Sequence, residues 1–534
     1  MKNLLLIIIL LSFNYTFAQV PEIDWMKRYG GISQDYLNEI IVTQDGGLFL
    51  SGSSNSGISG NKTQARIGGT QDYWVVKTDI HGTIEWQKTI GGGDVFGNLE
   101  AEVLRSGKQA PDGSYYLGGN SDSPIYGNKT VPNYGLQDYW IVKLDSEGDI
   151  LWQANIGGTN YEECYSLEVT SDGGCIVGGF SQSGISGNKT ESSRGGRDYY
   201  VVKLDSNGQI EWQKTYGGSG MDVLYSILVL ENNEYLLSGV SSSNISGDKT
   251  ENSKGGGDFW IIKINAAGSI IWQKTIGGNS ADTPYSLVKV LDGFVISGVS
   301  DSDISFDKTQ NSRGGSDYWL VKTDFEGNVI WDKTYGGDID DFAFGLLSFS
   351  DERGFVLVGA SYSGVTGDKT VVNYGEYNGW IIRTDENGEL LWQKGIGGTY
   401  LDLLSQVVEL PDKSILLGGG ANSLVSGNLT VVGFNSLDYW LVKLAPEELS
   451  VNEVVSNDFL VYPNPTTKEA NIKFTEHQEN IKVIVYNALF QVVDKLEFAS
   501  TSQVSFSINN SSGIYFVKMT NQDGKVYQSK IVKK

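Results

Sequence analysis

The chain has 534 residues, more than one compact core accommodates, so several domains or a repeat are expected. Its 68 glycines and only 9 prolines exclude collagen-like and proline-rich disordered chains, and 11% aromatic residues favour a folded β-protein. The formal net charge is −24, although the segment from Phe459 onward has nine Lys against six Asp and Glu. The body of the chain is therefore acidic, and we expect no nucleic-acid partner because an acidic surface repels phosphate backbones.

The N-terminus has the pattern of a secretory signal peptide. A basic start precedes an apolar run, Leu4–Leu11, and small residues lead up to Ala18. We predict that residues 1–18 are removed by cleavage between Ala18 and Gln19. The apolar run is shorter than the roughly 20 residues that a membrane-spanning helix needs, and no later segment is apolar enough, so no membrane span is expected.

Residues 19–445 repeat a unit of about 60 residues. All 13 tryptophans fall in two columns of this repeat, represented by Trp319 and Trp331, and we interpret both columns as core. Each unit contains four short β-branched and aromatic runs separated by Asp-Gly and Asp-x-x-Gly turns, which is typical of four hairpin-connected strands. The sequence therefore predicts an all-β fold in which this region forms a seven-bladed β-propeller with four strands per blade.

The ends of the repeat region predict how the ring closes. The mature chain begins with a lone fourth strand, Asp24–Lys27, and the seventh unit stops after its third strand, Tyr439–Lys443. Pairing these two strands completes the last blade and removes two exposed sheet edges. We therefore expect the N-terminal strand to close the last blade.

The repeat motif also carries a resemblance to a known family. Asp-Tyr-Trp-x-Val-Lys-x-Asp-x-x-Gly-x-x-x-Trp-Gln-Lys-Thr-x-Gly-Gly recurs over residues 22–445 and resembles a bacterial surface-protein propeller repeat whose units end in Leu/Ile/Tyr-Gly-Gly. The resemblance implies the propeller fold. It implies little about function, because propellers host many unrelated activities.

After residue 445 the repeat stops. An acidic linker, 446–458, leads to alternating strands over 459–534 that open with Tyr-Pro-Asn-Pro, contain Gly-Ile-Tyr-Phe-Val-Lys and end in a basic run. This region closely resembles the type A C-terminal sorting domain of type IX secretion substrates. The residues that carry the resemblance are Tyr462, Pro463, Asn464, Pro465, Gly513, Tyr515, Val517 and Lys518.

The resemblance implies a small antiparallel β-sandwich that the outer-membrane translocon of the type IX system recognises. It also implies removal of the tail, followed by release or by attachment to surface lipopolysaccharide. An ordinary adhesive β-sandwich is the alternative. The expected location is extracellular or on the outer cell surface, reached by signal-peptide export through the periplasm.

Candidate binding residues lie where one blade connects to the next. The loops between the second and third strands are long, and a carboxylate follows most Gly-Gly pairs by four residues. In a four-stranded blade both sets of loops emerge on one face. We predict that a ligand binds at this face. The alternative is that these carboxylates only brace their own loops. No cofactor is predicted, and bound calcium is a further alternative. The carboxylates are Asp35, Glu162, Asp222, Asp282, Asp341 and Asp402.

The long loops contain Asn-Lys-Thr at Asn61, Asn128 and Asn188, which matches a glycosylation sequon. The same position holds Asp248, Asp307 and Asp368 in other units, so we interpret it as a turn residue.

The sequence shows no catalytic constellation. Its two histidines are His81 and His477, and no Ser-His-Asp set, zinc motif or phosphate loop is present. We therefore predict a binding or adhesion propeller, delivered by its sorting domain, with a glycan, surface polysaccharide or protein as ligand. The alternatives are a carbohydrate-active enzyme, either a glycosidase or a lyase, and a structural surface-layer protein.

Overall fold

The computed structural model describes residues 19–93, 101–434, 436–447, 459–487, 492–508, 511–522 and 526–534. The chain divides into two compact units, Val20–Glu447 and one that contains Glu448–Lys534, and each is described by itself. No helix in the described part of the chain is long and apolar enough to cross a membrane. The predicted signal peptide, with its cleavage position at Ala18, lies outside the described residues.

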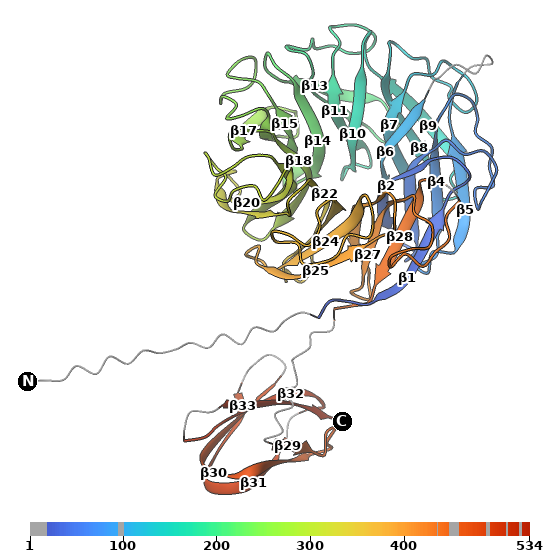
Figure 1. Ribbon diagram of the computed structural model, residues 1–534. Coiled ribbons are helices and arrows are strands. Elements are labelled where there is room, and N and C mark those ends of the chain that lie inside the picture. Colours follow the sequence, from blue (N-terminus) through green and yellow to red (C-terminus); the bar gives the residue numbers. More distant parts are fainter. Residues whose placement is uncertain are drawn as a thin grey trace, which may run out of the picture. The chain divides into compact units, whose positions relative to one another are not determined.

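Within the described residues, Val20–Glu447 forms seven antiparallel sheets of four strands that follow one another around a ring (Figure 1). This is the predicted seven-bladed β-propeller. We name the strands of each blade a to d, with strand a lining the central channel. Blade 1 consists of β2 (Asp35–Val42), β3 (Leu48–Ser54), β4 (Asp72–Thr78) and β5 (Ile84–Ile90). Blade 2 consists of β6 (Glu102–Gln109), β7 (Tyr115–Ser121), β8 (Asp138–Leu144) and β9 (Ile150–Ile156).

The remaining blades follow the same plan. Blade 3 consists of β10 (Glu162–Val169), β11 (Cys175–Ser181), β12 (Asp198–Leu204) and β13 (Ile210–Tyr216). Blade 4 consists of β14 (Asp222–Val229), β15 (Tyr235–Ser241), β16 (Asp258–Ile264) and β17 (Ile270–Ile276), with a short 3-10 helix, η1 (Glu231–Asn233), before β15. Blade 5 consists of β18 (Asp282–Val290), β19 (Gly293–Ser300), β20 (Asp317–Thr323) and β21 (Val329–Tyr335). Blade 6 consists of β22 (Asp341–Ser348), β23 (Phe355–Ser361), β24 (Asn378–Thr384) and β25 (Leu390–Ile396). Blade 7 consists of β26 (Asp402–Glu409), β27 (Ile415–Ala421), β28 (Asp438–Leu444) and β1 (Ile23–Tyr29).

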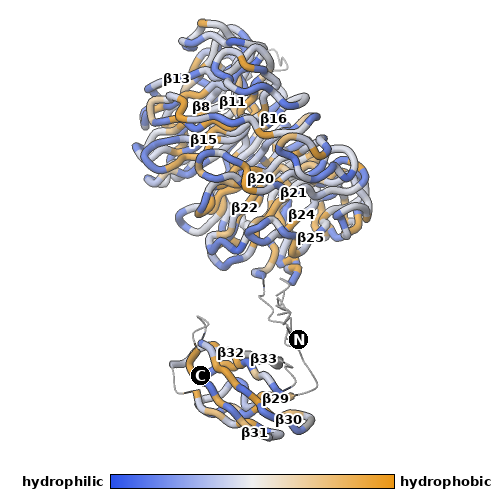
Figure 2. Tube along the Cα trace, turned by 90° about the vertical axis from the view of Figure 1, so that its left-hand side faces the viewer, coloured by the Kyte–Doolittle hydropathy of each residue, from blue (hydrophilic) through white to orange (hydrophobic). Residues whose placement is uncertain are grey.

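The core lies between neighbouring blades, which cover both faces of strands b and c. Figure 2 shows hydrophobic stretches along the strands of the propeller and hydrophilic ones in its loops. A tyrosine in strand c ties each of several blades to the next: Tyr73 donates to the carbonyl of Trp140 at 3.0 Å, and Tyr439 donates to that of Trp74 at 2.8 Å across the closing joint. The inner tryptophan column is fully buried and comprises Trp74, Trp140, Trp260, Trp319, Trp380 and Trp440.

The N-terminal strand closes the ring. Strand β1 pairs antiparallel with β28, in a register that places Arg28 opposite Trp440 and Tyr29 opposite Tyr439. In Figure 1 the blue strand β1 lies along the orange strand β28. The predicted closure is confirmed, and the two edges that would otherwise be exposed are paired with each other.

The closing blade carries its buried positive charge on a different strand from the other six. In those six blades the b–c loop contributes a buried lysine; Lys62, for example, donates to Thr89 Oγ1 of strand d at 2.7 Å. Blade 7 has Leu429 at the lysine position and Arg28 at the position of Thr89. Arg28 Nη2 lies 3.1 Å from Asp438 Oδ2. The N-terminal strand therefore brings the cation that the seventh loop lacks.

Glu447 follows β28 and packs against blade 6. Its Oε1 lies 2.8 Å from Arg383 Nε and accepts a hydrogen bond from Trp392 Nε1 at 2.8 Å. In blade 2 the corresponding tryptophan, Trp152, donates instead to a backbone carbonyl in the c–d turn of blade 3, at 3.0 Å. Blade 7 has no c–d turn, because its strand d is β1. Glu447 takes the place of that missing acceptor.

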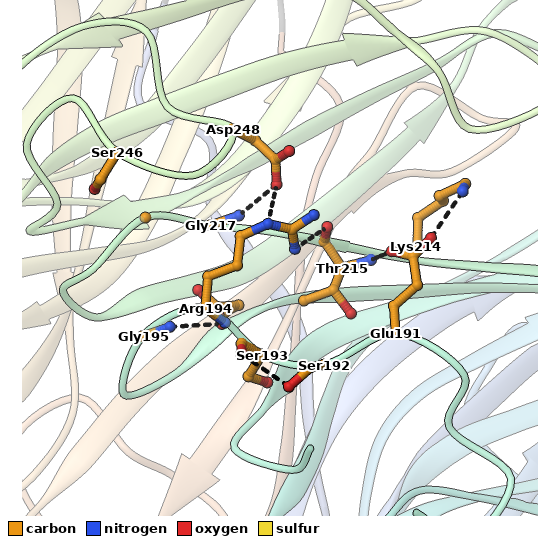
Figure 3. Close-up of polar contacts among 12 residues, drawn as sticks. Glu191, Ser192, Ser193, Arg194, Gly195, Lys214, Thr215, Gly217, Ser246 and Asp248 are labelled. Carbon is orange, nitrogen blue, oxygen red and sulfur yellow. Dashed lines mark hydrogen bonds and ion pairs between the residues drawn. The ribbon is translucent and has the colours of Figure 1, made fainter. Parts of the chain in front are cut away.

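Neighbouring blades also meet through their b–c loops. Asp248 of blade 4 accepts a hydrogen bond from the amide of Gly217 at 3.2 Å and pairs with Arg194 Nε at 3.0 Å, both in blade 3 (Figure 3). Arg194 is held in turn by the carbonyl of Thr215, 2.7 Å from its Nη1. Two further joints are built in the same way, by Lys254 with Asp307 and by Arg313 with Asp368.

Other joints have asparagine where these have aspartate. Asn188 Oδ1 accepts from the amide of Gly157 at 2.9 Å, and its Nδ2 donates to the carbonyl of Asn155 at 2.8 Å. The preceding blade places an uncharged residue, Tyr134, beside this loop in the place of Arg194. A charged residue at the Asp248 position thus occurs together with a charged residue at the Arg194 position, and an uncharged one with an uncharged one. The engaged amide of Asn188 favours the turn-residue interpretation over the sequon.

The unit that contains Glu448–Lys534 is a small antiparallel β-domain, as predicted. Its strands are ordered β29-β30-β32-β33, with β31 paired to β30. The long strands β30 and β31 pair along their length with a register shift, and β29 and β32 pair with different halves of β30, so both parts of the domain share one hydrogen-bonded set. The strands are β29 (Phe459–Tyr462), β30 (Glu469–Asn487), β31 (Val492–Ser507), β32 (Gly513–Thr520) and β33 (Val526–Lys533).

We expect Arg28→Thr to lower the free energy of unfolding by about 3–5 kcal/mol, because it leaves Asp438 buried without its cation. Adding Leu429→Lys recreates the lysine–threonine pair of blades 1, 3, 4 and 5 and should recover most of the loss. Denaturant unfolding followed by tryptophan fluorescence measures both, since all 13 tryptophans lie in the propeller. A double variant no more stable than Arg28→Thr alone would contradict this account of blade 7.

A chain ending at Glu448 should be more stable than one ending at Ala445, because the shorter chain leaves Arg383 without its carboxylate and Trp392 without its acceptor. Glu447→Gln in the full chain, which keeps the shape but removes the charge, should lie between them in melting temperature. Equal melting temperatures for the two shortened chains would show that Glu447 contributes nothing to blade 6.

Candidate functional site

The six carboxylates predicted to bind a ligand each begin a strand a, and all six are fully buried. Blade 2 has a buried Glu102 at the same position, which sequence spacing missed because of the insertion that starts at Gly93. Residues 94–100 of that insertion lie outside the described residues. Aligning the strand that starts at Glu102 with the one that starts at Glu162 would have found it. The six positions are Asp35, Glu162, Asp222, Asp282, Asp341 and Asp402.

Each carboxylate holds the turn that precedes it. Asp222 Oδ2 accepts hydrogen bonds from the amide of Gly218 at 2.8 Å and from Ser243 Oγ at 2.8 Å. Asp341 makes the same contacts in blade 6, to Gly337 at 2.7 Å. A Cβ on Gly218 would lie 2.6 Å from the Cβ of Ser243, which is why this position of the Gly-Gly pair has no side chain. The motif and its carboxylate form one structural unit.

A buried lysine balances this charge from inside the blade. Burial lowers the pKa of Lys62 to about 8, and the carboxylates of Asp72 and Asp35 oppose that shift. Burial raises the pKa of Asp35, while hydrogen bonds, the largest from Ser54, oppose the rise. Burial likewise raises the pKa of Asp282 to about 6. Internal partners therefore account for at least one oxygen of each carboxylate, which is Oδ2 in Asp222, Asp282 and Asp341. The Oδ1 atoms of these three are buried and have no hydrogen-bond partner among the described residues.

The alternative that these carboxylates brace their own loops explains every contact they make. Their predicted role in binding stays a prediction. Among the described residues, no three His, Cys, Asp or Glu side chains are arranged to hold a metal ion.

The central channel is where the seven blades differ. A cavity of about 540 Å³ is lined by the middle of the a strands of all the blades. A β-bulge interrupts each a strand there, as between Leu37 and Glu39 in β2, and the bulged residue lines the cavity. A bulge adds one unpaired residue and re-aims its side chain. The bulged residues are Asn38, Arg105, Tyr165, Tyr225, Tyr285, Phe344 and Ser405.

Four of these residues form an aromatic arc across blades 3 to 6: Tyr165, Tyr225, Tyr285 and Phe344. Successive ring centroids are 5.1, 5.4 and 5.4 Å apart, with interplanar angles of 63°, 50° and 66°. The first and last pairs have the edge-to-face geometry that aromatic rings prefer, and the middle pair is tilted. Burial raises the pKa of Tyr285 to about 12, so its hydroxyl stays protonated. The arc combines flat apolar faces with hydroxyl groups, a lining typical of small-molecule sites.

The opposite part of the channel wall is polar. Lys108 Nζ lies 3.1 Å from Glu168 Oε1 and also pairs with Glu39, so one lysine joins blades 1, 2 and 3. Ser106 Oγ donates to Glu39 Oε2 at 2.6 Å. Burial alone would lower the pKa of Lys108, but the two glutamates raise it. At the position of Lys108 and Glu168, blades 4 to 7 have the aliphatic residues Leu228, Val288, Leu347 and Val408. At the position of Glu39 they have Ser226, Ser286, Gly345 and Gln406, none of which is charged.

Two other cavities lie near the same strands. One of about 300 Å³ shares Tyr285 and Phe344 with the channel and adds apolar side chains, including Phe342 and Leu403. The other, of about 800 Å³, lies among the a–b turns and includes Leu291 in its lining. The first extends the aromatic arc toward the face that carries the b–c and d–a loops, which we call the loop face.

The predicted sorting motif is structured. Tyr462 ends β29, and Asn464 Oδ1 accepts from the amide of Val532 at 2.9 Å, which ties the segment with Pro463 and Pro465 to the last strand. In β32, Gly513 is the first residue, Tyr515 and Val517 are buried in the core, and Lys518 is partly exposed.

Comparison with known proteins identifies this unit. Residues 460–534 match the family described as the secretion system C-terminal sorting domain. The C-terminal domain is a type IX sorting domain, and it marks a protein secreted to the cell surface or the extracellular space. The chain thus combines a β-propeller with a C-terminal sorting domain.

Similarity over the propeller is more distant. The regulatory protein FlaEY of Caulobacter vibrioides is 27% identical over 191 residues, 33% of this chain and 20% of FlaEY. An uncharacterized WD repeat-containing protein of Acanthamoeba polyphaga mimivirus is 24% identical over 184 residues, 30% of this chain and 13% of that protein. The chain thus matches less than two thirds of either relative.

Among solved structures, the Pan2 WD40 domain of Neurospora crassa has a TM-score of 0.42 at 10% identity, covering 79% of this chain and 96% of that one. Kuenenia stuttgartiensis hydrazine synthase has a TM-score of 0.41 at 10% identity, covering 73% and 94%. The propeller assignment rests on the sheet order, not on these values.

We expect the triple variant Asp222→Asn, Asp282→Asn and Asp341→Asn to lose stability, by about 1–3 kcal/mol per site, because each amide disturbs hydrogen bonds to buried donors. Thermal unfolding measures this, with the exposed Asp303→Asn as the control. Unchanged stability together with lost binding to the host's surface polymers would restore the carboxylates as a ligand site.

Proposed function

We propose that this protein is an exported binding module that takes its ligand in the central channel, against the aromatic arc. The sorting domain supports the export part of this proposal. The geometry of the channel supports the binding, since a cavity of about 540 Å³ is large enough for one or two sugar rings.

One observation carries the proposal: the bulge position is occupied differently from blade to blade. Many other positions of the repeat vary less, such as the carboxylate that begins strand a and the aromatic residue of strand c, which is tryptophan in six blades and Tyr200 in blade 3. At the bulge it places Asn38 and Arg105 on one side, and then four aromatic rings. A purely structural ring has no need for such asymmetry, whereas recognition of an asymmetric ligand requires it.

The alternatives fit the channel less well. A glycosidase needs two carboxylates free to act as acid and base or nucleophile. The two glutamates that flank the channel cavity, Glu39 and Glu168, are both held by Lys108. A surface-layer protein would present repeated outer contacts and leave the channel without a role.

The proposed route to the surface has two steps. The signal peptide, residues 1–18, directs export to the periplasm and is cleaved between Ala18 and Gln19. The type IX translocon then recognises the folded sorting domain. A surface polysaccharide or glycan is the proposed ligand class, because pyranose rings offer an apolar face to aromatic side chains.

A glycan array with the full mature chain tests the proposal. Tyr225→Ala with Tyr285→Ala should weaken binding by about tenfold or more, since each aromatic contact contributes about 0.5–1.5 kcal/mol. The exposed loop-face tyrosines supply the control, Tyr161→Ala with Tyr400→Ala, which should bind normally.

Melting temperatures confirm that all variants are folded, and assay of released sugar tests the enzyme alternative. Binding that survives the channel change but not the control change would move the site to the loop face, where the sequence placed it.

A further inference from the structure

We propose that the channel selects an anionic ligand, a sugar ring that carries a carboxylate, and that Arg105 and Arg197 recognise the charge. This inference rests on the proposed binding function of the channel and specifies the chemistry of the ligand.

Arg105 lies at the end of the aromatic arc and has no polar partner among the described residues. Its guanidinium carbon lies 5.2 Å from the ring centroid of Tyr165, a cation–π contact. Its Nε is buried and has no hydrogen-bond partner among the described residues, and no ion pair forms there either. A buried donor without an acceptor is costly, so the site is completed when a ligand supplies one.

Arg197 approaches the same aromatic cluster from the b–c loop of blade 3. Its guanidinium carbon lies 4.5 Å from the ring centroid of Phe180, which itself lies 6.3 Å from that of Tyr165. Phe180 also packs with Tyr165 and Tyr225. Within the described part of the chain, Arg197 has no side-chain hydrogen bond or ion pair. Two guanidinium groups are thus held by aromatic rings alone.

The other arginines show that this is unusual here. The chain has a formal net charge of −24, so carboxylates are plentiful. Among the described residues, five arginines are paired with one or more of them: Arg28, Arg194, Arg313, Arg353 and Arg383. Arg105 and Arg197 have no such partner among these residues. A carboxylate does lie close to the aromatic cluster, since Glu163 accepts a hydrogen bond from Tyr165 at 2.8 Å.

A carboxylate on a pyranose ring matches this arrangement. The planar guanidinium binds a carboxylate through two parallel hydrogen bonds, while the ring lies against the arc. The polar cluster has two carboxyl groups, Glu39 and Glu168, against the single ammonium group of Lys108, so it offers no excess positive charge to the anionic end of the ligand. The carboxylate is therefore directed to Arg105 and the remainder of the ligand along the arc.

Two matched probes test the inference: digalacturonate and its fully methyl-esterified form, which share the same two rings but differ in charge. Isothermal titration calorimetry with the full mature chain should show the acid binding about tenfold or more tightly than the ester. Arg105→Gln and Arg197→Gln should each reduce this preference, and together abolish it, while binding of the ester changes little. The control is Arg66→Gln, a loop arginine without an ion pair, which should keep the preference.

The outcomes separate this inference from the proposed function. Equal binding of acid and ester by the unchanged protein would overturn the anionic class and leave the channel as a binding site. A preference that survives both arginine changes would overturn the assigned residues. Binding of neither probe would overturn the uronate class, while the glycan array with the tyrosine variants decides separately whether the channel binds at all.

Discussion

A buried carboxylate begins every a strand, and a buried anion requires hydrogen-bond donors and a cation nearby. Six blades meet this requirement with a lysine from their own b–c loop. Blade 7 cannot, because it has Leu429 at that position. Arg28 of the N-terminal strand provides the charge instead: it pairs with Asp438 at the start of strand c and interacts electrostatically with Asp402 at the start of strand a. Ring closure is therefore electrostatic as well as hydrogen-bonded. Without β1, the last blade would lose an edge strand and its only cation near these carboxylates among the described residues.

This requirement explains why the loop face is so uniform. The Gly-Gly pair, the carboxylate and the serines form a unit repeated with little change, and the joints between blades vary only in matched pairs, as Arg194 with Asp248 or Tyr134 with Asn188. A residue that takes part in such a unit cannot be substituted to bind a ligand without lowering the stability of its blade. The inner wall of the ring is less constrained, because the bulged residues face the channel cavity and take no part in these repeated contacts.

Most of the fold could be predicted from the sequence, since the repeat specifies strands and turns, and the orphan strand at Trp25 specifies the closure. The proposed channel site was not predicted, for two physical reasons. Periodicity places Asp222 at the end of a loop but cannot show that its side chain turns inward to Gly218 and Ser243. A bulge shifts the alternation of side chains along the strand. For a residue at a bulge, such as Tyr225, the sequence pattern therefore does not indicate which face of the sheet its side chain lies on. The signal in the sequence that could have indicated the channel site was the variation in residue type at one position of the repeat, where Arg105 and Phe344 occur in different blades.

The same reasoning indicates why recognition belongs at the centre. Seven equivalent positions around a ring offer either seven equal sites or one shared site on the axis, and only the axis lets unlike residues act on one ligand. Here the axis is lined by an apolar arc and a polar wall, with unpaired arginine at their junction. A ligand that meets all three must itself be asymmetric, with an apolar face and a charged end. Such a ligand can lie in the channel in only one orientation, so the propeller can bind with specificity although its blades are nearly alike.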